Sequence, residues 1–399
     1  MGRFLLFSKS NAACSFCEKC KDLFEKHRLE YDETSFENLA GLKTHVHEFI
    51  DPENITSFPL IVTPDKNVVY GYQQLRDLLE ERVLCSPEKL SVFPVQYPKL
   101  FDFYKKHVAS FWVADEIEVD SPEEFESLDG PEREFLTNIL AFFAQSDGIV
   151  NANLMRHFIN EVKLQESLMF YSIQSFMESE HGLTYSLMLE NLIRDEGEKK
   201  RCFDAISEIP AVKKKANWAM KFMSPTRRFC ERLVAFAAVE GILFSGSFAA
   251  IFWIKQQYPD KMKGLYQANS FISRDENLHY DHAVELFRTL DHKPDEKTVH
   301  AIIREAVDHE IEFITESISC KMIGMSVESM TLYIKFVADT MARDLGFSSL
   351  YGVGECPFNF MQTLGMNSKT NFFETRPTEY QKSTGNLVML GDDDDDDDF

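Results

Sequence analysis

Apolar and polar positions alternate in two different ways along the chain, and the change falls between residues 83 and 95. Before it, short apolar runs are interleaved with amphipathic stretches. We expect strands at Phe4–Phe7, Ser57–Thr63 and Asn67–Tyr70, and helices at Cys17–His27 and Leu75–Glu81. This mixture predicts a small α/β domain over residues 1–82, followed by a linker at 83–95.

Helical periodicity dominates after the linker, and glycine and proline are rare inside the apolar repeats. The candidate helices span residues 100–114, 131–157, 160–194, 198–208, 211–222, 226–255, 261–290, 296–319 and 326–347. The pattern therefore predicts an all-α bundle over residues 96–375. Residues 376–399 are polar and include seven consecutive aspartates, so we expect a flexible acidic tail there.

One apolar run, Leu233–Ile254, is long enough to cross a membrane. It contains a carboxylate, Glu240, which would be costly at the centre of a bilayer. We therefore expect a helix buried on all sides in a bundle, and no membrane association.

Charge and cysteine usage narrow the class of protein. The formal net charge is −23, which argues against a nucleic-acid-binding protein because such a protein needs a basic face. Of the eight cysteines only Cys14, Cys17 and Cys20 cluster, so a secreted disulfide framework is not expected. The N-terminus does not resemble a signal peptide. We expect a cytoplasmic protein, in the host cytoplasm if its source is viral.

Acidic residues interrupt the apolar face of four predicted helices. Two of these helices carry Glu-x-x-His, whose ends are neighbours on one helix face, and the other two carry one acid each. The residues are Asp147, Glu178, His181, Glu240, Glu276 and His279. Ferritin-like di-metal proteins have such a ligand set, so a ferritin-like bundle with a di-metal carboxylate site is predicted.

The chemistry of these ligands limits the choice of metal. Two divalent cations would neutralise four buried carboxylates, each of which costs several kcal/mol when unpaired. Oxygen-rich ligation with one imidazole per metal suits iron or manganese better than zinc. A single Glu-x-x-His usually marks an exposed ion pair, and Asp147 alone could cap a helix. The prediction therefore depends on the whole set.

Tyr185 lies four residues after His181 and so shares the helix face of the predicted ligands. Three apolar residues at helical spacing from the other ligands are expected to surround its phenol: Phe244, Phe248 and Ile272. Such residues could shield a tyrosyl radical on the phenol. Aromatic residues at helical spacing are more often ordinary core, however, so periodicity alone favours plain packing.

Five segments together resemble the small subunit of class I ribonucleotide reductase, of the eukaryotic or large-DNA-virus type. They are Ala109–Trp112, Phe142–Asn151, Val234–Gly241, Ser245–Phe248 and Ile272–Glu276. The match runs from about Phe93 to Phe399 and keeps the spacing between segments. It implies a ribonucleoside-diphosphate reductase subunit in which two iron ions and dioxygen generate a tyrosyl radical. A separate large subunit would use that radical to make deoxyribonucleotides.

The resemblance also implies roles for single residues. The six predicted ligands match the iron ligands, and Tyr185 matches the radical tyrosine. Trp112 and Asp275, with His181, match the path from the metals to the surface. Tyr380 matches the tyrosine that relays the radical, and Phe399 the anchor that docks on the large subunit. The family forms homodimers, which we expect here. The alternatives are a stand-alone di-iron oxidase or iron-storage protein, and a non-catalytic scaffold.

A second resemblance concerns residues 1–82. Cys14-Ser-Phe-Cys17 follows a predicted strand and opens a predicted helix, whose dipole favours a thiolate. Together with Phe7-Ser-Lys9, Ser57-Phe-Pro59 and Gly71, it resembles glutaredoxin. That family implies a thioredoxin-like fold, a Cys14–Cys17 dithiol, a cis-Pro59 turn facing the thiol, and glutathione as a candidate cofactor. The alternative is a metal site that includes Cys20. A tethered dithiol would reach oxidised cysteines of the large subunit at a raised effective concentration.

Overall fold

The computed structural model describes residues 3–10, 14–26, 29–47, 50–64, 66–80, 82–85, 91–224, 227–317 and 326–361. The chain divides into two compact units, Met1–Phe358 and Asn359–Phe399, and of the second only residues 359–361 are described. Tyr380, Phe399 and the predicted tail at 376–399 therefore lie outside the described residues.

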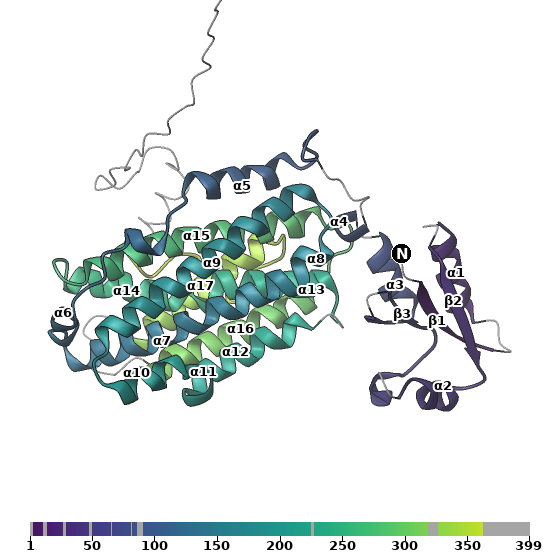
Figure 1. The fold of residues 1–399 in the computed structure, drawn as a ribbon, viewed down its shortest axis with the longest axis horizontal. Coiled ribbons are helices and arrows are strands. Elements are labelled where there is room, and N and C mark those ends of the chain that lie inside the picture. The colour runs from purple at the N-terminus through teal and green to yellow at the C-terminus, as the bar shows by residue number, and fades with distance from the viewer. Residues whose placement is uncertain are drawn as a thin grey trace, which may run out of the picture. The chain divides into compact units, whose positions relative to one another are not determined.

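The N-terminal region is a four-stranded mixed sheet with helices on both faces (Figure 1). β1 is parallel to β2 and antiparallel to β3, which pairs with β4, so the strand order is β2-β1-β3-β4. Leu6 of β1 packs with α1 and α3 on one face, and Phe7 packs with α2 on the other. The elements are β1 (Phe4–Lys9), α1 (Ser15–Lys26), β2 (Tyr31–Phe36), α2 (Leu39–Val46), η1 (Pro52–Asn54), β3 (Leu60–Val62), β4 (Val68–Tyr70), α3 (Gly71–Glu80) and α4 (Arg82–Cys85).

The sequence pattern did not predict β2 or α2. β2 reads Tyr-Asp-Glu-Thr-Ser-Phe and is an edge strand with four exposed side chains, so it has no apolar run to mark it. α2 buries only Leu42 and Val46, too few apolar positions to show a helical period. The other predicted strands and helices of this region are present with shifted ends.

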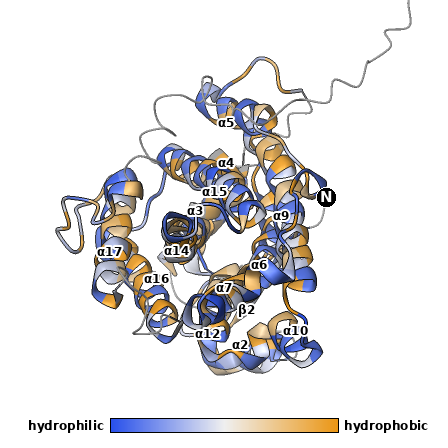
Figure 2. Ribbon diagram, turned by 90° about the vertical axis from the view of Figure 1, so that its left-hand side faces the viewer, coloured by the Kyte–Doolittle hydropathy of each residue, from blue (hydrophilic) through white to orange (hydrophobic). Residues whose placement is uncertain are grey.

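Helices, most of them long, make up most of the rest of the described chain (Figure 1). Figure 2 looks along them and shows α14 inside a ring of other helices, where it packs against α7, α15, α16 and α17. The long helices are α5 (Pro98–Ala109), α7 (Gly130–Asn153), α9 (Gln165–Leu192), α12 (Pro210–Met223), α13 (Phe229–Ala238), α14 (Ser245–Gln257), α15 (Lys263–Thr289), α16 (Glu296–Ser317) and α17 (Val327–Asp344). The short ones are η2 (Ala114–Glu116), α6 (Pro122–Glu126), η3 (Leu154–Phe158), α8 (Ile159–Glu161), α10 (Glu196–Phe203), α11 (Ala205–Glu208) and η4 (Val239–Leu243).

The most apolar helix of the described residues, Phe229–Gln257, is the core of this bundle. It is long and apolar enough to cross a membrane, yet 94% of its most apolar stretch is buried inside the protein. This burial confirms the prediction of a helix surrounded on all sides. The helix is not continuous, however, because the π-helical turn η4 separates α13 from α14. A π-helical turn contains one extra residue, which shifts the helical period of apolar positions. Where every face of the helix is apolar, this shift cannot be seen in the sequence.

Candidate metal centre

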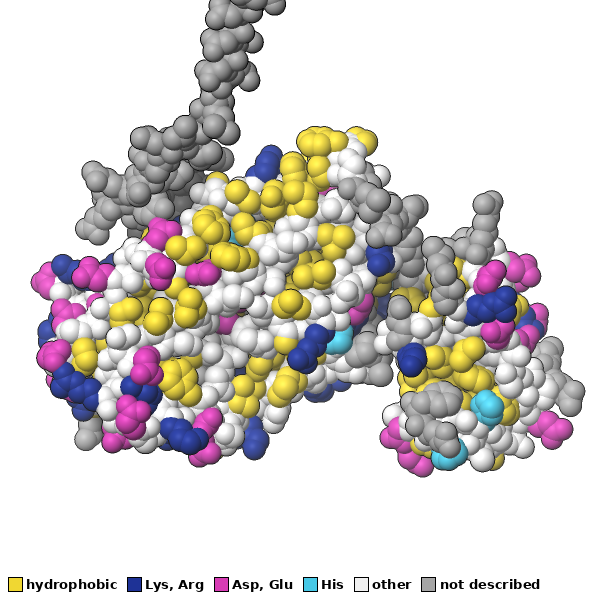
Figure 3. Space-filling model, viewed as in Figure 1, with side chains coloured by type: hydrophobic (Ala, Val, Ile, Leu, Met, Phe, Trp, Pro, Cys, Tyr) yellow, Lys and Arg dark blue, Asp and Glu magenta, His cyan; other side chains and the backbone are white. Residues whose placement is uncertain are grey.

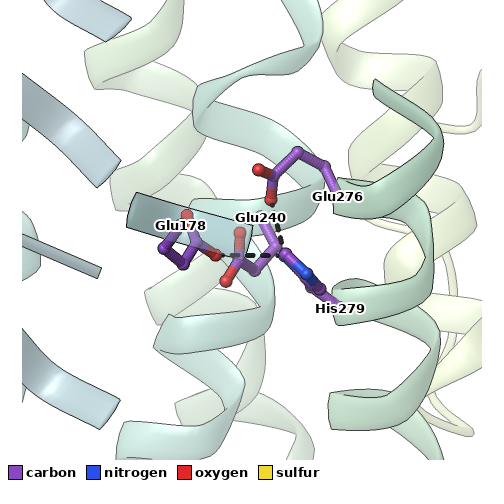
Figure 4. A group of neighbouring side chains, drawn as sticks. All are labelled: Glu178, Glu240, Glu276 and His279. Atoms are coloured by element: carbon purple, nitrogen blue, oxygen red, sulfur yellow. Dashed lines mark hydrogen bonds and ion pairs between the residues drawn. The ribbon is translucent and has the colours of Figure 1, made fainter. Parts of the chain in front are cut away.

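Four elements bring the six predicted ligands together in the middle of the bundle. Asp147 comes from α7, Glu178 and His181 from α9, Glu240 from η4, and Glu276 and His279 from α15. Two groups form, and within each the candidate ligand atoms lie within 4.8 Å of one another. The first, called the His181 position, contains Asp147, Glu178 and His181; the second, the His279 position, contains Glu178, Glu240, Glu276 and His279 (Figure 4).

The described residues leave several oxygen atoms of this cluster without hydrogen-bond partners. These are Oδ2 of Asp147, both carboxylate oxygens of Glu178, Oε2 of Glu240 and Oε1 of Glu276. Each lies in a buried side chain, where an unsatisfied charged oxygen is costly. Two cations that share Glu178 would satisfy these atoms and neutralise the charge. The donor set therefore fits a di-metal carboxylate site of the kind that holds iron or manganese.

Ionisation in the cluster reflects burial and crowding of like charges. Burial, and next the charge of Glu178 or Glu276, raises the pKa of Asp147 and of Glu240 well above the usual carboxyl range. Burial alone would lower the pKa of His279, but Glu276 and Glu178 raise it to about 9. Without cations, protons are thus held between these groups, and metal binding must displace them.

Asp275 links one predicted ligand to Trp112. The indole Nε1 of Trp112 donates to Oδ2 of Asp275 at 2.7 Å, and Nε2 of His181 lies 3.3 Å from the same oxygen. The indole also stacks on the His181 ring, with centroids 5.8 Å apart. Burial would raise the pKa of Asp275, but the Arg274 guanidinium and His181 hold it well below the usual range. Asp275 is therefore a buried carboxylate that joins the two side chains.

Two further residues touch the predicted ligands and were missed in the sequence. Gln174 donates from Nε2 to Oε1 of Glu240 at 3.0 Å. Nε2 of His107, from α5, lies 2.8 Å from Nε2 of His279. Gln174 precedes Glu178 by four residues, so its place on the same helix face was readable. His107 had no such signal, because α5 carries no predicted ligand.

Tyr185 is fully buried, and Phe143 covers one face of its ring. The two rings stack with centroids 4.6 Å apart. Phe244 and Phe248, which were expected around the phenol, pack against Phe143, at 5.7 and 5.0 Å. Ile272 is buried on α15. Phe143 precedes Asp147 by four residues, so helical spacing could have identified it.

The phenol itself stays protonated. Burial, and then the charges of Asp147 and Glu276, raises the pKa of Tyr185 well above its usual value. Its hydroxyl has no hydrogen-bond partner among the described residues. The structure thus places a neutral phenol beside the carboxylates, in surroundings of aromatic carbon.

The N-terminal cysteines form a disulfide between Cys14 and Cys17. Cys17 is buried on α1, Cys14 is half-buried just before the helix, and the Cys17 backbone N–H donates to Cys14 Sγ at 3.3 Å. Cys20 is a free thiol in the apolar core, and burial raises its pKa to about 12. The Phe58–Pro59 peptide bond is cis.

Comparisons with known proteins agree with this geometry. The family model for the small chain of ribonucleotide reductase matches residues 89–357. The small chain of ribonucleoside-diphosphate reductase from vaccinia virus (strain Ankara) is 46% identical over 305 residues, which cover 76% of this chain and 95% of the relative. The corresponding small chain from Plasmodium falciparum (isolate Dd2) is 44% identical over 334 residues, covering 84% and 95%.

A solved structure shares the fold of the bundle. The ribonucleotide reductase Rnr4 homodimer from Saccharomyces cerevisiae is 31% identical, with a TM-score of 0.64, and the match covers 72% of this chain and 93% of that one. The family model spans more than half of this chain and includes all six residues of the carboxylate–histidine cluster. The chain therefore belongs to the ribonucleotide reductase small-chain family, as the small chain of a ribonucleoside-diphosphate reductase.

Proposed function

We propose that this small chain generates and stores a radical on Tyr185 and passes it to a large subunit that makes deoxyribonucleotides. The observation that carries the proposal is the burial of the Tyr185 phenol under Phe143, next to a cluster of four carboxylates and two imidazoles. A stand-alone oxidase or storage protein would need the carboxylates but not a phenol so enclosed.

Six side chains would hold the metals, which we propose to be two iron ions: Asp147, Glu178, His181, Glu240, Glu276 and His279. When bound, the ions supply the one-electron oxidation of the phenol with dioxygen as the oxidant. The protein's part is to keep Tyr185 protonated beforehand and to exclude water and reductants afterwards. Burial and the aromatic rings around Phe143 serve both purposes.

The path of the electron and the proton from the metal centre towards the surface would run through Asp275. Its carboxylate accepts a hydrogen bond from Trp112 Nε1 and faces Nε2 of His181, so it can hold or move a proton between the two rings. It also fixes which nitrogen of His181 faces the cluster. We propose that an electron and a proton travel together along Trp112, Asp275 and His181. Tyr380 and Phe399 would continue the path and dock on the large subunit.

Electron paramagnetic resonance tests the central assignment. Full-length protein treated with iron(II) and oxygen should show a tyrosyl radical, and Tyr185→Phe should abolish it while the iron content stays the same. A radical of equal yield in Tyr185→Phe would place it on another residue. Failure of the wild-type chain to bind iron or manganese would favour a non-catalytic scaffold.

We also propose that the chain forms a homodimer through an exposed apolar patch. Figure 3 shows apolar side chains gathered over α5. The α5–α9 patch consists of Val108 and Phe111, at and just after the end of α5, and Phe176 and Leu183 on α9, all at least 43% exposed. Phe111 stacks on Phe176 with ring centroids 5.5 Å apart, so the two parts are continuous. A contiguous exposed patch of this kind is typical of a protein interface.

For residues 1–82 we propose a glutaredoxin-like dithiol module that uses glutathione. Support comes from the Cys14–Cys17 disulfide at the start of α1 and from the mixed sheet behind it. Cys14 is the more exposed of the pair, so its thiolate would attack a substrate disulfide, and Cys17 would then release the product. The alternative metal site needs Cys20 as a thiolate, which its apolar burial opposes.

A further inference from the structure

His107 lies behind one of the predicted ligands, on the side away from the metal site. Its Nε2 is 2.8 Å from Nε2 of His279, and both side chains are fully buried. The other ring nitrogen of His279, Nδ1, lies 3.1 Å from an oxygen of Glu276 and 3.1 Å from one of Glu178. Nδ1 therefore faces the carboxylates (Figure 4), and Nε2 faces His107.

This geometry fixes the protons on both rings. A metal on Nδ1 of His279 requires the ring proton to be on Nε2. That N–H points at Nε2 of His107, which must accept it and so carries its own proton on Nδ1. Nδ1 of His107 is buried and has no hydrogen-bond partner among the described residues. An unpaired buried N–H costs free energy. In this arrangement the cost falls on Nδ1 of His107, and Nε2 of the same ring is left as an acceptor for His279.

The two predicted imidazole ligands thus have different partners. His181 faces the carboxylate of Asp275, whereas His279 faces the neutral ring of His107. A carboxylate partner raises the basicity of a ligating imidazole more than a neutral acceptor does. The imidazole of His279 should therefore be the less basic of the two ligands.

We propose that His107 is a positioning residue for the metal at the His279 position, where it fixes the tautomer and ring orientation of His279 by accepting its Nε2 proton. The inference rests on the di-metal site of the proposed function. It adds a residue outside the ligand set that acts on one of the two metal positions only.

His282 offers a matched control. It lies on the same helix as His279, is equally buried, and stacks on Phe170, which also contacts His107. Its Nε2 lies 3.2 Å from Ser167 Oγ rather than from a ligand. A change at His282 therefore disturbs the same packing without touching the ligand's hydrogen bond.

The experiment titrates the metal-free, full-length chain with manganese(II) and follows the free ion by electron paramagnetic resonance. The wild type should bind two ions. His107→Leu should weaken one site by about 10–100-fold and leave the other unchanged. His107→Gln, whose amide oxygen can accept the Nε2 proton, should restore the weakened site to within a few-fold, and His282→Leu should leave both sites as in the wild type.

Two kinds of result would contradict the proposed role of His107. Unchanged binding in His107→Leu, or equal weakening in His107→Leu and His107→Gln, overturns the inference. Should His107→Leu fail to fold, His107→Asn takes its place, because its amide is too short to reach Nε2 of His279. A wild-type chain that binds no manganese or iron would instead overturn the di-metal site itself, which separates the two failures.

Discussion

Asp275 shows how the chemistry of a single side chain can be tested apart from metal binding. The amide oxygen of Asn can still accept from Trp112 Nε1 and face Nε2 of His181, but Asn carries no negative charge to take up a proton, and its amide N–H₂ would face the Arg274 guanidinium. We expect Asp275→Asn to lower turnover with the large subunit by about 10–100-fold. The Tyr185 radical should still form, so spin count and turnover must be measured on the same sample. Normal turnover in this variant would remove Asp275 from the path.

At the scale of residues, much of the candidate site could be predicted from helical spacing. Glu-x-x-His places two ligands on one face regardless of what surrounds the helix, so the pairs in α9 and α15 were readable from the sequence. Contacts made across the bundle were not readable. His107 meets His279 across 172 residues of chain, and no local pattern encodes such a contact.

At the scale of elements, a buried ion pair supports the turn that carries Glu240. Lys215 on α12 donates to the carbonyl oxygen of Leu243, at the end of η4, at 2.6 Å and to Glu310 on α16 at 2.7 Å. Its ammonium also lies 3.5 Å from the centre of the Phe142 ring. Burial, opposed by the charge of Glu310, lowers the pKa of Lys215 to about 8. The Lys215 ammonium therefore links three elements: α12, η4 and α16.

Removal of one partner of this pair should be more harmful than removal of both. Lys215→Met leaves the buried Glu310 carboxylate without its cation, at an expected cost of about 3–5 kcal/mol. The double variant Lys215→Met with Glu310→Gln removes both charges and should recover most of that loss. Urea unfolding of the metal-free chain measures the free energies. A double variant as unstable as Lys215→Met alone would show that packing, not charge, is responsible.

The elements themselves were predicted well where one face is apolar and the other polar. α15 and α16 have that pattern and begin within two residues of the prediction. The pattern missed η4 because the sequence around it is apolar on all sides of the helix. It missed β2 because that strand is polar on both faces. Both are stabilised by tertiary contacts that a local period cannot report.

At the scale of the whole molecule, the α5–α9 patch predicts the state of association. Phe176→Glu with Leu183→Glu puts two charges on the patch without changing a buried residue, so the chain should remain folded. We expect the wild type to sediment as a dimer and the variant as a monomer. Lys200→Glu with Met220→Glu, exposed positions outside the patch, serves as the control. A dimeric patch variant would place the interface elsewhere.

The dithiol module raises the question of whether the two ends of the molecule work together. Cys14→Ser should abolish glutathione-dependent reduction of a small disulfide, because the more exposed thiol of the pair is the attacking group. Cys20→Ser should retain that activity, since Cys20 lies in the apolar core; its loss together with bound zinc would instead favour a metal site.

Neither substitution touches the carboxylate cluster, so manganese binding and the Tyr185 radical should be unchanged in both variants. If the module serves this enzyme, Cys14→Ser with the large subunit should turn over slowly when glutathione is the only reductant and normally when dithiothreitol is supplied. The reason is that a tethered dithiol meets the oxidised cysteines at an effective concentration set by the linker. Equal turnover with either reductant would mean that the dithiol acts on other substrates.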